Sequence, residues 1–383
     1  MKKKTIGIVT IFDCDNYGAD LQAYALPTAL NAWGYQAELI DYPFYKSPRF
    51  RRTRQSAPIL PLSFINRLKE FIVRWRGRLL GKRSSPNALQ RAEAFAAFRE
   101  RIPTSDTYPT LDALLDHPPA YDVYMTGSDQ VWNPRMGANI RPYFLDFLPE
   151  DAVRVAYAAS FGVSVLPDAV QSQYKTWLNR YRAVGCREAQ GVKLVQGLCP
   201  QVPVQNVLDP TLLLTADQWL NAVTIPDGIS GKRYLLVYEL VSAPALWDLV
   251  RHWAADLNAE IVRVVGHADT PPMDGVTTIA DAGPGEFVGL FSQATAVVTT
   301  SFHGTAFSTI FNKPFYSVIP SQMKNSSRQH DLLDLLGLLD RMIPETDVSA
   351  LLPKDLSNWN SINEKLISAR EKSKQFLTTS VIH

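Results

Sequence analysis

A histidine at the end of an apolar run is the first group in the sequence that could do chemistry. Ser301-Phe302-His303-Gly304 follows the apolar residues 295–300 directly. A histidine in this position can act as a general acid or base near neutral pH. We expect a helix to begin here, and its first backbone N–H groups, around Ser301 and Gly304, would favour a phosphate or carboxylate. The alternative is a histidine that only closes a strand.

A second cluster, residues 127–134, also follows an apolar run and contains Ser128, Asp129, Gln130, Trp132 and Asn133. An amphipathic aromatic side chain beside amide and carboxylate groups suits a sugar, which has both C–H faces and hydroxyls. We therefore expect Ser128, Gln130, Trp132 and Asn133 to hold a sugar acceptor. The alternative, equally open from the sequence, is a capped helix start with Trp132 buried.

Two smaller clusters could bind anions. In Asn16-Tyr17-Gly18, the glycine allows close backbone approach at the start of a predicted helix, and we expect these three residues on the acceptor side. The alternative is that Asn16 only caps the helix. Arg187-Glu188 follows residues 181–186, and an arginine there can bind phosphate or carboxylate through two hydrogen bonds. The alternative is a surface ion pair.

The sequence predicts no metal site and no disulfide. Asp13-Cys14-Asp15 has the spacing of a metal-binding pair of aspartates, but no further ligand set accompanies it. The three cysteines, Cys14, Cys186 and Cys199, form no Cys-x-x-Cys pair, which excludes the usual zinc spacing and fits a reducing cytosol. The N-terminal apolar run 5–11 is too short to span a membrane and reads as a first buried strand.

The alternation of strands and helices predicts an α/β fold with two Rossmann-like domains. We expect domains over 1–205 and 206–360, and a terminal segment 361–383, helical over 361–377, that packs back on the first domain. Ligands of parallel sheets bind beyond the carboxyl ends of the strands, so the site is expected in a cleft between the domains. The predicted strands cover 5–11, 37–40, 122–127, 153–159, 234–240, 260–265, 295–300 and 315–318.

One segment is strongly basic. Residues 46–83 hold twelve Lys or Arg and one acid, Glu70, which leaves 27 basic and 36 acidic residues elsewhere. The acidic remainder excludes general nucleic-acid binding. Within the variable stretch 43–90, residues 62–80 have helical periodicity with cationic flanks. This helix either packs on the first domain or lies on an anionic membrane surface.

Taken together, these clusters resemble the polysaccharide pyruvyltransferase family. The resemblance covers most of the chain outside 43–90, and its order and spacing are more specific than any single piece. The matching stretches are 16–18 with 21–26, 127–133, 156–162, 187–188, 209–211, 286–287, 301–304 and 313–315.

The resemblance implies a fold similar to GT-B glycosyltransferases, phosphoenolpyruvate as donor with no cofactor, and a ketal-linked pyruvate on a polysaccharide or lipid-linked precursor. It implies that Arg187 and His303 contact the donor. Many members have a basic residue just before the histidine, where this chain has Ser301-Phe302, and we expect Arg328 and Lys313 to supply the missing cation. Asp129 or Glu286 would orient groups or relay a proton.

Two other functions stay open from the sequence. One is a nucleotide-sugar glycosyltransferase of the same fold, and the other is a non-catalytic carbohydrate-binding protein. A carbohydrate-binding protein would not need Arg187 and His303 together. For the enzyme we expect a cytoplasmic location. The basic segment 46–83 suggests the inner face of the membrane as the alternative.

Overall fold

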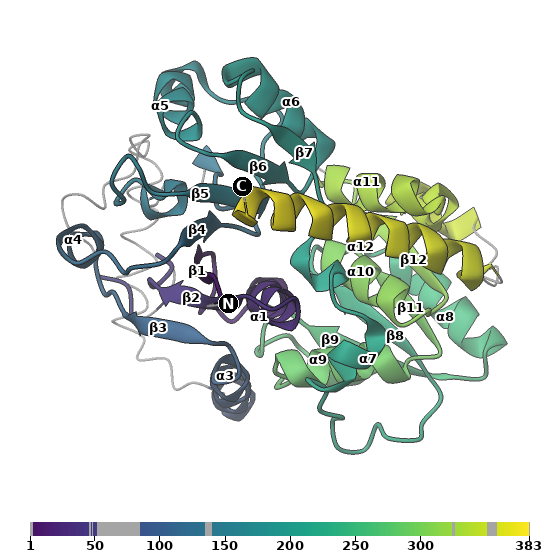
Figure 1. The fold of residues 1–383 in the computed structure, drawn as a ribbon. Helices are drawn as coiled ribbons and strands as arrows, with labels where there is room; N and C mark the ends of the chain where they lie inside the picture. The colour runs from purple at the N-terminus through teal and green to yellow at the C-terminus, as the bar shows by residue number, and fades with distance from the viewer. Residues whose placement is uncertain are drawn as a thin grey trace.

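The computed structural model describes residues 3–45, 47, 49–51, 85–134, 140–323, 326–350 and 358–382. The predicted helix 62–80 and most of the basic segment lie outside these residues. The described chain forms two parallel sheets, each flanked by helices, and this confirms the predicted fold class (Figure 1).

The first sheet has the strand order β3-β2-β1-β4-β5-β6-β7, and all its strand pairs are parallel. Its inner strands are almost wholly apolar because helices cover both faces. The strands are β1 (Thr5–Val9), β2 (Gln36–Asp41), β3 (Thr104–Thr107), β4 (Val123–Thr126), β5 (Arg154–Ala159), β6 (Ala183–Cys186) and β7 (Val204–Asn206). The helices of this part are α1 (Tyr17–Ala32), α3 (Pro86–Arg99), α4 (Leu111–Asp116), α5 (Asp168–Leu178) and α6 (Ala189–Leu198).

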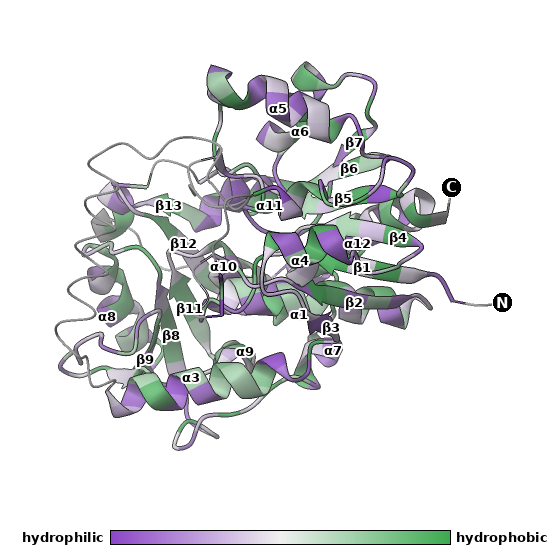
Figure 2. Cartoon of the chain, turned by 90° about the vertical axis from the view of Figure 1, so that its left-hand side faces the viewer, coloured by the Kyte–Doolittle hydropathy of each residue, from purple (hydrophilic) through white to green (hydrophobic). Residues whose placement is uncertain are grey.

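The second sheet has the order β10-β9-β8-β11-β12-β13 and is also parallel. Its strands are β8 (Tyr234–Glu239), β9 (Glu260–Val265), β10 (Thr277–Ile279), β11 (Ala296–Thr299), β12 (Phe315–Ile319) and β13 (Met342–Pro344). The helices are α7 (Ala216–Leu220), α8 (Leu246–Asp256), α9 (Pro284–Gln293), α10 (Phe302–Ile310), α11 (Ser327–Leu336) and α12 (Trp359–Ile382). In Figure 2 the strands of both sheets are mostly apolar, whereas the outer helices carry polar faces.

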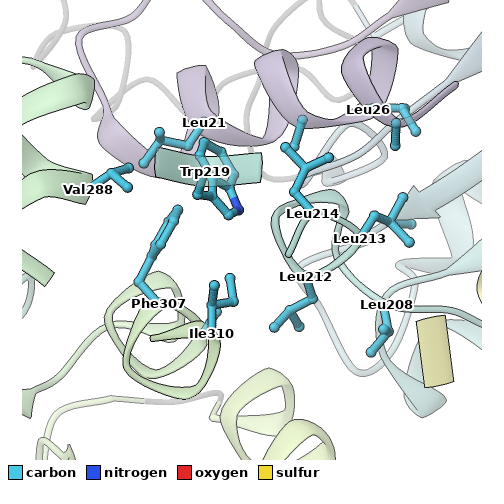
Figure 3. Packing of buried hydrophobic residues seen from close by; sticks show 14 of the residues in the cluster. Leu21, Leu26, Leu208, Leu212, Leu213, Leu214, Trp219, Val288, Phe307 and Ile310 are labelled. Atoms are coloured by element: carbon cyan, nitrogen blue, oxygen red, sulfur yellow. The ribbon is translucent and has the colours of Figure 1, made fainter. Parts of the chain in front are cut away.

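The two sheets share one continuous hydrophobic core. The connecting segment, with η4 (Pro210–Leu212) and α7, lies between α1 and the helices α9 and α10 (Figure 3). Its buried side chains Leu212, Leu214 and Trp219 lie among residues of both parts in the same cluster. Because these apolar side chains are buried together, the carboxyl edges of the two sheets are held in position relative to each other.

Helix α12 crosses from the second sheet to the first (Figure 1). The Phe376 ring lies 6.5 Å from that of Tyr157 on β5, and Ser373 Oγ accepts a hydrogen bond of 3.1 Å from Leu208 N. Helix α3 also reaches the second part, where Ser85 Oγ donates to Asp269 Oδ1 over 2.9 Å. The two parts are therefore tied together on either side of the carboxyl edges.

Candidate active site

A cleft of about 740 Å³ opens where the carboxyl ends of both sheets meet. Its walls include residues of the β1–α1 loop, the loop after β4, and the ends of β8, β9 and β11. The clusters that the sequence singled out are represented here by Asn16, Asp129, Gln130, His303 and Arg328. The cleft has room for a ligand much larger than a three-carbon acid.

His303 lies in the first turn of α10 and is 9% exposed. Its Nε2 is buried without a hydrogen-bond partner among the described residues, and the nearest acid is Asp209, with Oδ2 at 3.8 Å. Burial, together with the Arg187 and Arg328 cations, lowers the pKa of His303 to about 4 against the opposing effect of the aspartates. His303 is therefore neutral near pH 7 and can accept a proton.

Arg187, at the end of β6, is an internal cation rather than a surface group. Its side chain is 1% exposed. Nη1 donates to Asp209 Oδ2 over 2.9 Å, and Nη2 donates to Asp129 Oδ1 over 3.1 Å. Burial alone would raise the pKa of Asp129, but Arg187, Arg328 and His303 hold it below the usual range. Both carboxylates are thus ionised, and Arg187 lies behind Asp129 as seen from the cleft.

Asp209 connects the histidine to this ion pair. Its Oδ1 accepts from Thr211 N and Oγ1 over 3.0 and 2.7 Å, which fixes the carboxylate. Its Oδ2 accepts from Arg187 Nη1 over 2.9 Å. In the sequence, residues 209–211 are only a part of the family resemblance. The role of Asp209 is not visible there, because its partner Arg187 lies 22 positions away along the chain.

Arg328 is the cation that faces the cleft. It lies in the first turn of α11, and its guanidinium carbon is 5.7 Å from the Phe302 ring centroid, the same separation as that of Arg187 from this ring. It forms no ion pair within the part of the chain that the structure describes. Burial and the neighbouring Arg187 lower the pKa of Arg328 from its usual value, against the opposing effect of Asp129, Glu188 and Asp209.

The residues around Gly18 bring the first part of the chain against His303. A side-chain carbon on Gly18 would lie 2.2 Å from His303 Nδ1, so only glycine permits this approach. Asn16 caps α1, with its Oδ1 accepting from Ala19 N over 3.1 Å, and also lines the cleft. Tyr17 is 1% exposed, donates to Ala282 O over 2.8 Å and stacks on Phe287, so it joins the two parts instead of offering its ring to a ligand.

The prediction that Trp132 holds a sugar acceptor is wrong. Its ring is fully buried, stacks on Phe144 at 5.2 Å, and donates through Nε1 to Tyr143 O over 3.0 Å. Ser128 is also fully buried, and its hydroxyl donates to Ala158 O. Asn133 is 8% exposed and donates to the Gln130 side chain over 2.8 Å. Of this cluster, only Asp129 and Gln130 reach the cleft.

Three other predicted site residues, Glu286, Lys313 and Gly304, are not among the residues that line the cleft. Glu286 caps its own helix by accepting from Gly283 N over 3.0 Å, and it does not line the cleft. Lys313 lies beyond the far end of α10, and the helix alone runs about 10 Å from His303 to Ile310 at 1.5 Å per residue. Gly304 packs on Thr299, where a side-chain carbon would lie 2.2 Å from Oγ1. Glu286 thus supports the fold, and Gly304 contributes only its backbone to the first turn of α10.

The aspartates of the β1–α1 loop are neutralised by arginines. Arg99 contacts Asp13, Asp15 and Asp20 at 3.1, 2.7 and 2.8 Å, and Arg49 contacts Asp13 at 2.8 Å. Burial and the Asp20 charge raise the pKa of Cys14 in the same loop. Among the described residues no group of His, Cys, Asp and Glu could hold a metal ion.

The fold and the cleft define an α/β protein with two parallel sheets and a site between their carboxyl edges. Residues 16–322 match the family described as polysaccharide pyruvyl transferase, and the chain belongs to this family. It is therefore a transferase. No curated protein matches the sequence. Among the described residues no helix is long and apolar enough to cross a membrane.

Solved structures of the same architecture show low sequence identity. A UDP-N-acetylglucosamine 2-epimerase matches with a TM-score of 0.51 and 11% identity, over 98% of this chain and 95% of its own. The glycosyltransferase SnogD from Streptomyces nogalater matches with a TM-score of 0.49 and 12% identity, over 99% of this chain and all 100% of its own. The epimerase from Rickettsia bellii gives 0.48 and 11%, over 100% and 97%.

Proposed function

We propose that this enzyme transfers the pyruvyl group of phosphoenolpyruvate to two hydroxyls of a sugar, forming a ketal and releasing phosphate. The observation that supports it best is Arg328, a cation without a counter-ion among the described residues, which lines the same cleft as the neutral His303. Membership of the pyruvyl transferase family gives the reaction class.

The donor carries a phosphate and a carboxylate and needs two anchors. Arg328 provides one as a direct partner. The N-terminus of α10, next to Ser301, provides the other, because its first backbone N–H groups have no partner within the helix. Arg187 acts behind them: it holds Asp129 and Asp209 in place, and its charge favours an anion in the cleft.

His303 serves to move a proton. As the oxygen of the first hydroxyl bonds to C2 of the donor, its proton passes to His303 Nε2 and from there to C3, which becomes the methyl group. The oxygen of the second hydroxyl then replaces phosphate at C2, and the second proton leaves with the phosphate. Both hydroxyl protons are accounted for, and no net proton is consumed. Such proton transfer contributes about 10²–10⁴-fold in rate.

The acceptor would lie against Asn16 and Gln130, two predicted acceptor residues that line the cleft, whereas Tyr17 lines it but is 1% exposed. The basic segment 46–83 adds a second element to the proposal, namely docking at an anionic membrane surface where a lipid-linked acceptor is available. Co-sedimentation with vesicles tests this element: retention that does not depend on anionic lipid would remove it.

The test of the proposed function is phosphate release from phosphoenolpyruvate in the presence of a saccharide acceptor. His303→Gln should lower kcat about 100-fold or more. His252→Gln, which changes an exposed histidine on α8, is the matched control and should leave kcat unchanged. Transfer from a nucleotide sugar with phosphoenolpyruvate unused would replace the proposal by the glycosyltransferase function. Normal turnover by His303→Gln would remove His303 from the mechanism.

A further inference from the structure

Arg263 is a buried arginine on the wall of the same cleft, in the second sheet. It lies on β9 and is 6% exposed, with its guanidinium carbon 5.8 Å from the Trp247 ring centroid of α8. Nη2 donates to Pro271 O over 2.6 Å and to Thr278 Oγ1 over 3.4 Å. Nε is buried without a partner, and no carboxylate of the described chain forms an ion pair with this guanidinium.

Two other buried arginines, Arg187 and Arg154, are compensated. Arg187 contacts two aspartates, and Arg154 donates to five backbone carbonyls. Glu239 is the acid that faces Arg263 from β8, but its Oε1 accepts from Ala243 N over 2.7 Å. Burying a cation without a counter-ion costs free energy unless a ligand supplies the charge. The arrangement of Arg263 is therefore that of a site for an anion.

This site is separate from the donor anchors. Strand β8 lies between β9 and β11, so Arg263 and the strand that leads to His303 are about 10 Å apart at the usual strand spacing. The cleft of about 740 Å³ has room for a second substrate beside phosphoenolpyruvate, and the anion at Arg263 is assigned to that substrate.

We propose that Arg263 forms a second anion subsite, which binds a phosphate group attached to the acceptor saccharide. The assignment to the acceptor rests on the proposed function, whereas the anion site itself rests on the geometry of Arg263. A guanidinium binds a phosphate through charge-assisted hydrogen bonds, and Arg263 lines the cleft from which a phosphate would approach. A diphosphate carried by a nucleotide and one carried by a polyprenyl chain share this chemistry.

Calorimetric titration with inorganic pyrophosphate tests the subsite. Arg263→Met should weaken binding at least about tenfold, since a charge-assisted hydrogen bond contributes about 1.5–3 kcal/mol. Arg328→Met, which changes the donor cation, is titrated in parallel, and Arg233→Met, at an exposed position before β8, should bind as the wild type does. Unchanged binding by Arg263→Met, or no binding by the wild type, would overturn the proposal. Loss only in Arg328→Met would assign pyrophosphate to the donor site and overturn it too.

Three further measurements keep the result interpretable. Near-ultraviolet circular dichroism should show that Arg263→Met is folded, because removing an uncompensated buried charge does not destabilise. If that variant does not fold, Arg263→Lys keeps the charge and should retain more binding than Arg263→Gln. Phosphoenolpyruvate titrated in parallel should still bind Arg263→Met. If phosphoenolpyruvate binds neither the wild type nor any variant, while pyrophosphate binding is still lost in Arg263→Met, the proposed function fails and the anion site stands.

The carrier of the phosphate is identified by comparing UDP with citronellyl diphosphate. Tighter binding of UDP indicates a nucleotide carrier, and tighter binding of citronellyl diphosphate indicates a polyprenyl carrier.

Discussion

His303 should make the folded enzyme sensitive to mild acid. Its pKa falls from 6.5 in its ordinary state to about 4 in the folded protein, because burial disfavours the charged imidazole. On acidification the unfolded chain therefore takes up a proton before the folded chain does. The stability linked to His303 is present in full above pH 6.5 and is lost as the pH falls toward 4.

The size of the effect follows from the pKa difference. One pKa unit corresponds to about 1.4 kcal/mol, so the full effect is about 3 kcal/mol and most of it is lost by pH 4.5. Replacing His303 by glutamine removes the titrating group but retains a polar side chain. The variant should therefore lose about 2 to 3 kcal/mol less stability than the wild type between pH 7 and pH 4.5.

Urea unfolding at a series of pH values measures this difference directly. The wild type and His252→Gln, which changes an exposed histidine, should lose stability in parallel, while His303→Gln should follow a shallower curve. Carboxylates titrate in all three proteins, so only the difference between curves is informative. Identical curves for His303→Gln and the wild type would show that His303 is not buried in its neutral form, and the assignment of a proton acceptor would fall.

Three substitutions test the architecture of the site. Trp132→Ala should cost about 3–5 kcal/mol in urea unfolding, because it empties a buried position; an effect confined to acceptor KM would restore the sugar platform. Gly18→Ala should lower kcat about 100-fold in a transfer assay, since the new methyl group displaces the His303 imidazole, and an unchanged kcat would contradict that contact. Glu286→Ala should cost about 1 kcal/mol through the lost cap on Gly283 and leave kcat within about twofold; a large loss of kcat would make Glu286 catalytic.

Much of the architecture follows from local sequence patterns. Apolar runs predicted the inner strands of both sheets except β6, and the polar residues after them fall at one cleft because parallel strands end on the same edge. The edge strand β3 was not predicted, since its sequence Thr-Ser-Asp-Thr is polar and largely exposed. Helix α1 continues through Pro27 to Ala32.

The side-chain environments could not be predicted in the same way. An amphipathic tryptophan suits a sugar platform and a core equally well, and only the tertiary positions of Phe144 and Tyr143 decide for Trp132. The two candidate cations were equivalent in sequence. Helix α10 carries the chain away from His303 toward Lys313, and the turn through β12 to α11 brings Arg328 back. The role of Asp209 depends on Arg187 and His303, which lie on different elements.

Direct titration of phosphoenolpyruvate tests the central claim of a donor site at Arg328. The wild type should bind, with a rise in unfolding free energy of about 2.7 kcal/mol at a hundredfold excess over Kd. Arg328→Met should bind at least about tenfold more weakly, and Arg233→Met should bind normally. Arg187 is less suitable for this test because removing it leaves two buried carboxylates unpaired and costs about 3–5 kcal/mol. No binding of phosphoenolpyruvate by the wild type, with a sugar nucleotide binding instead, would contradict the account.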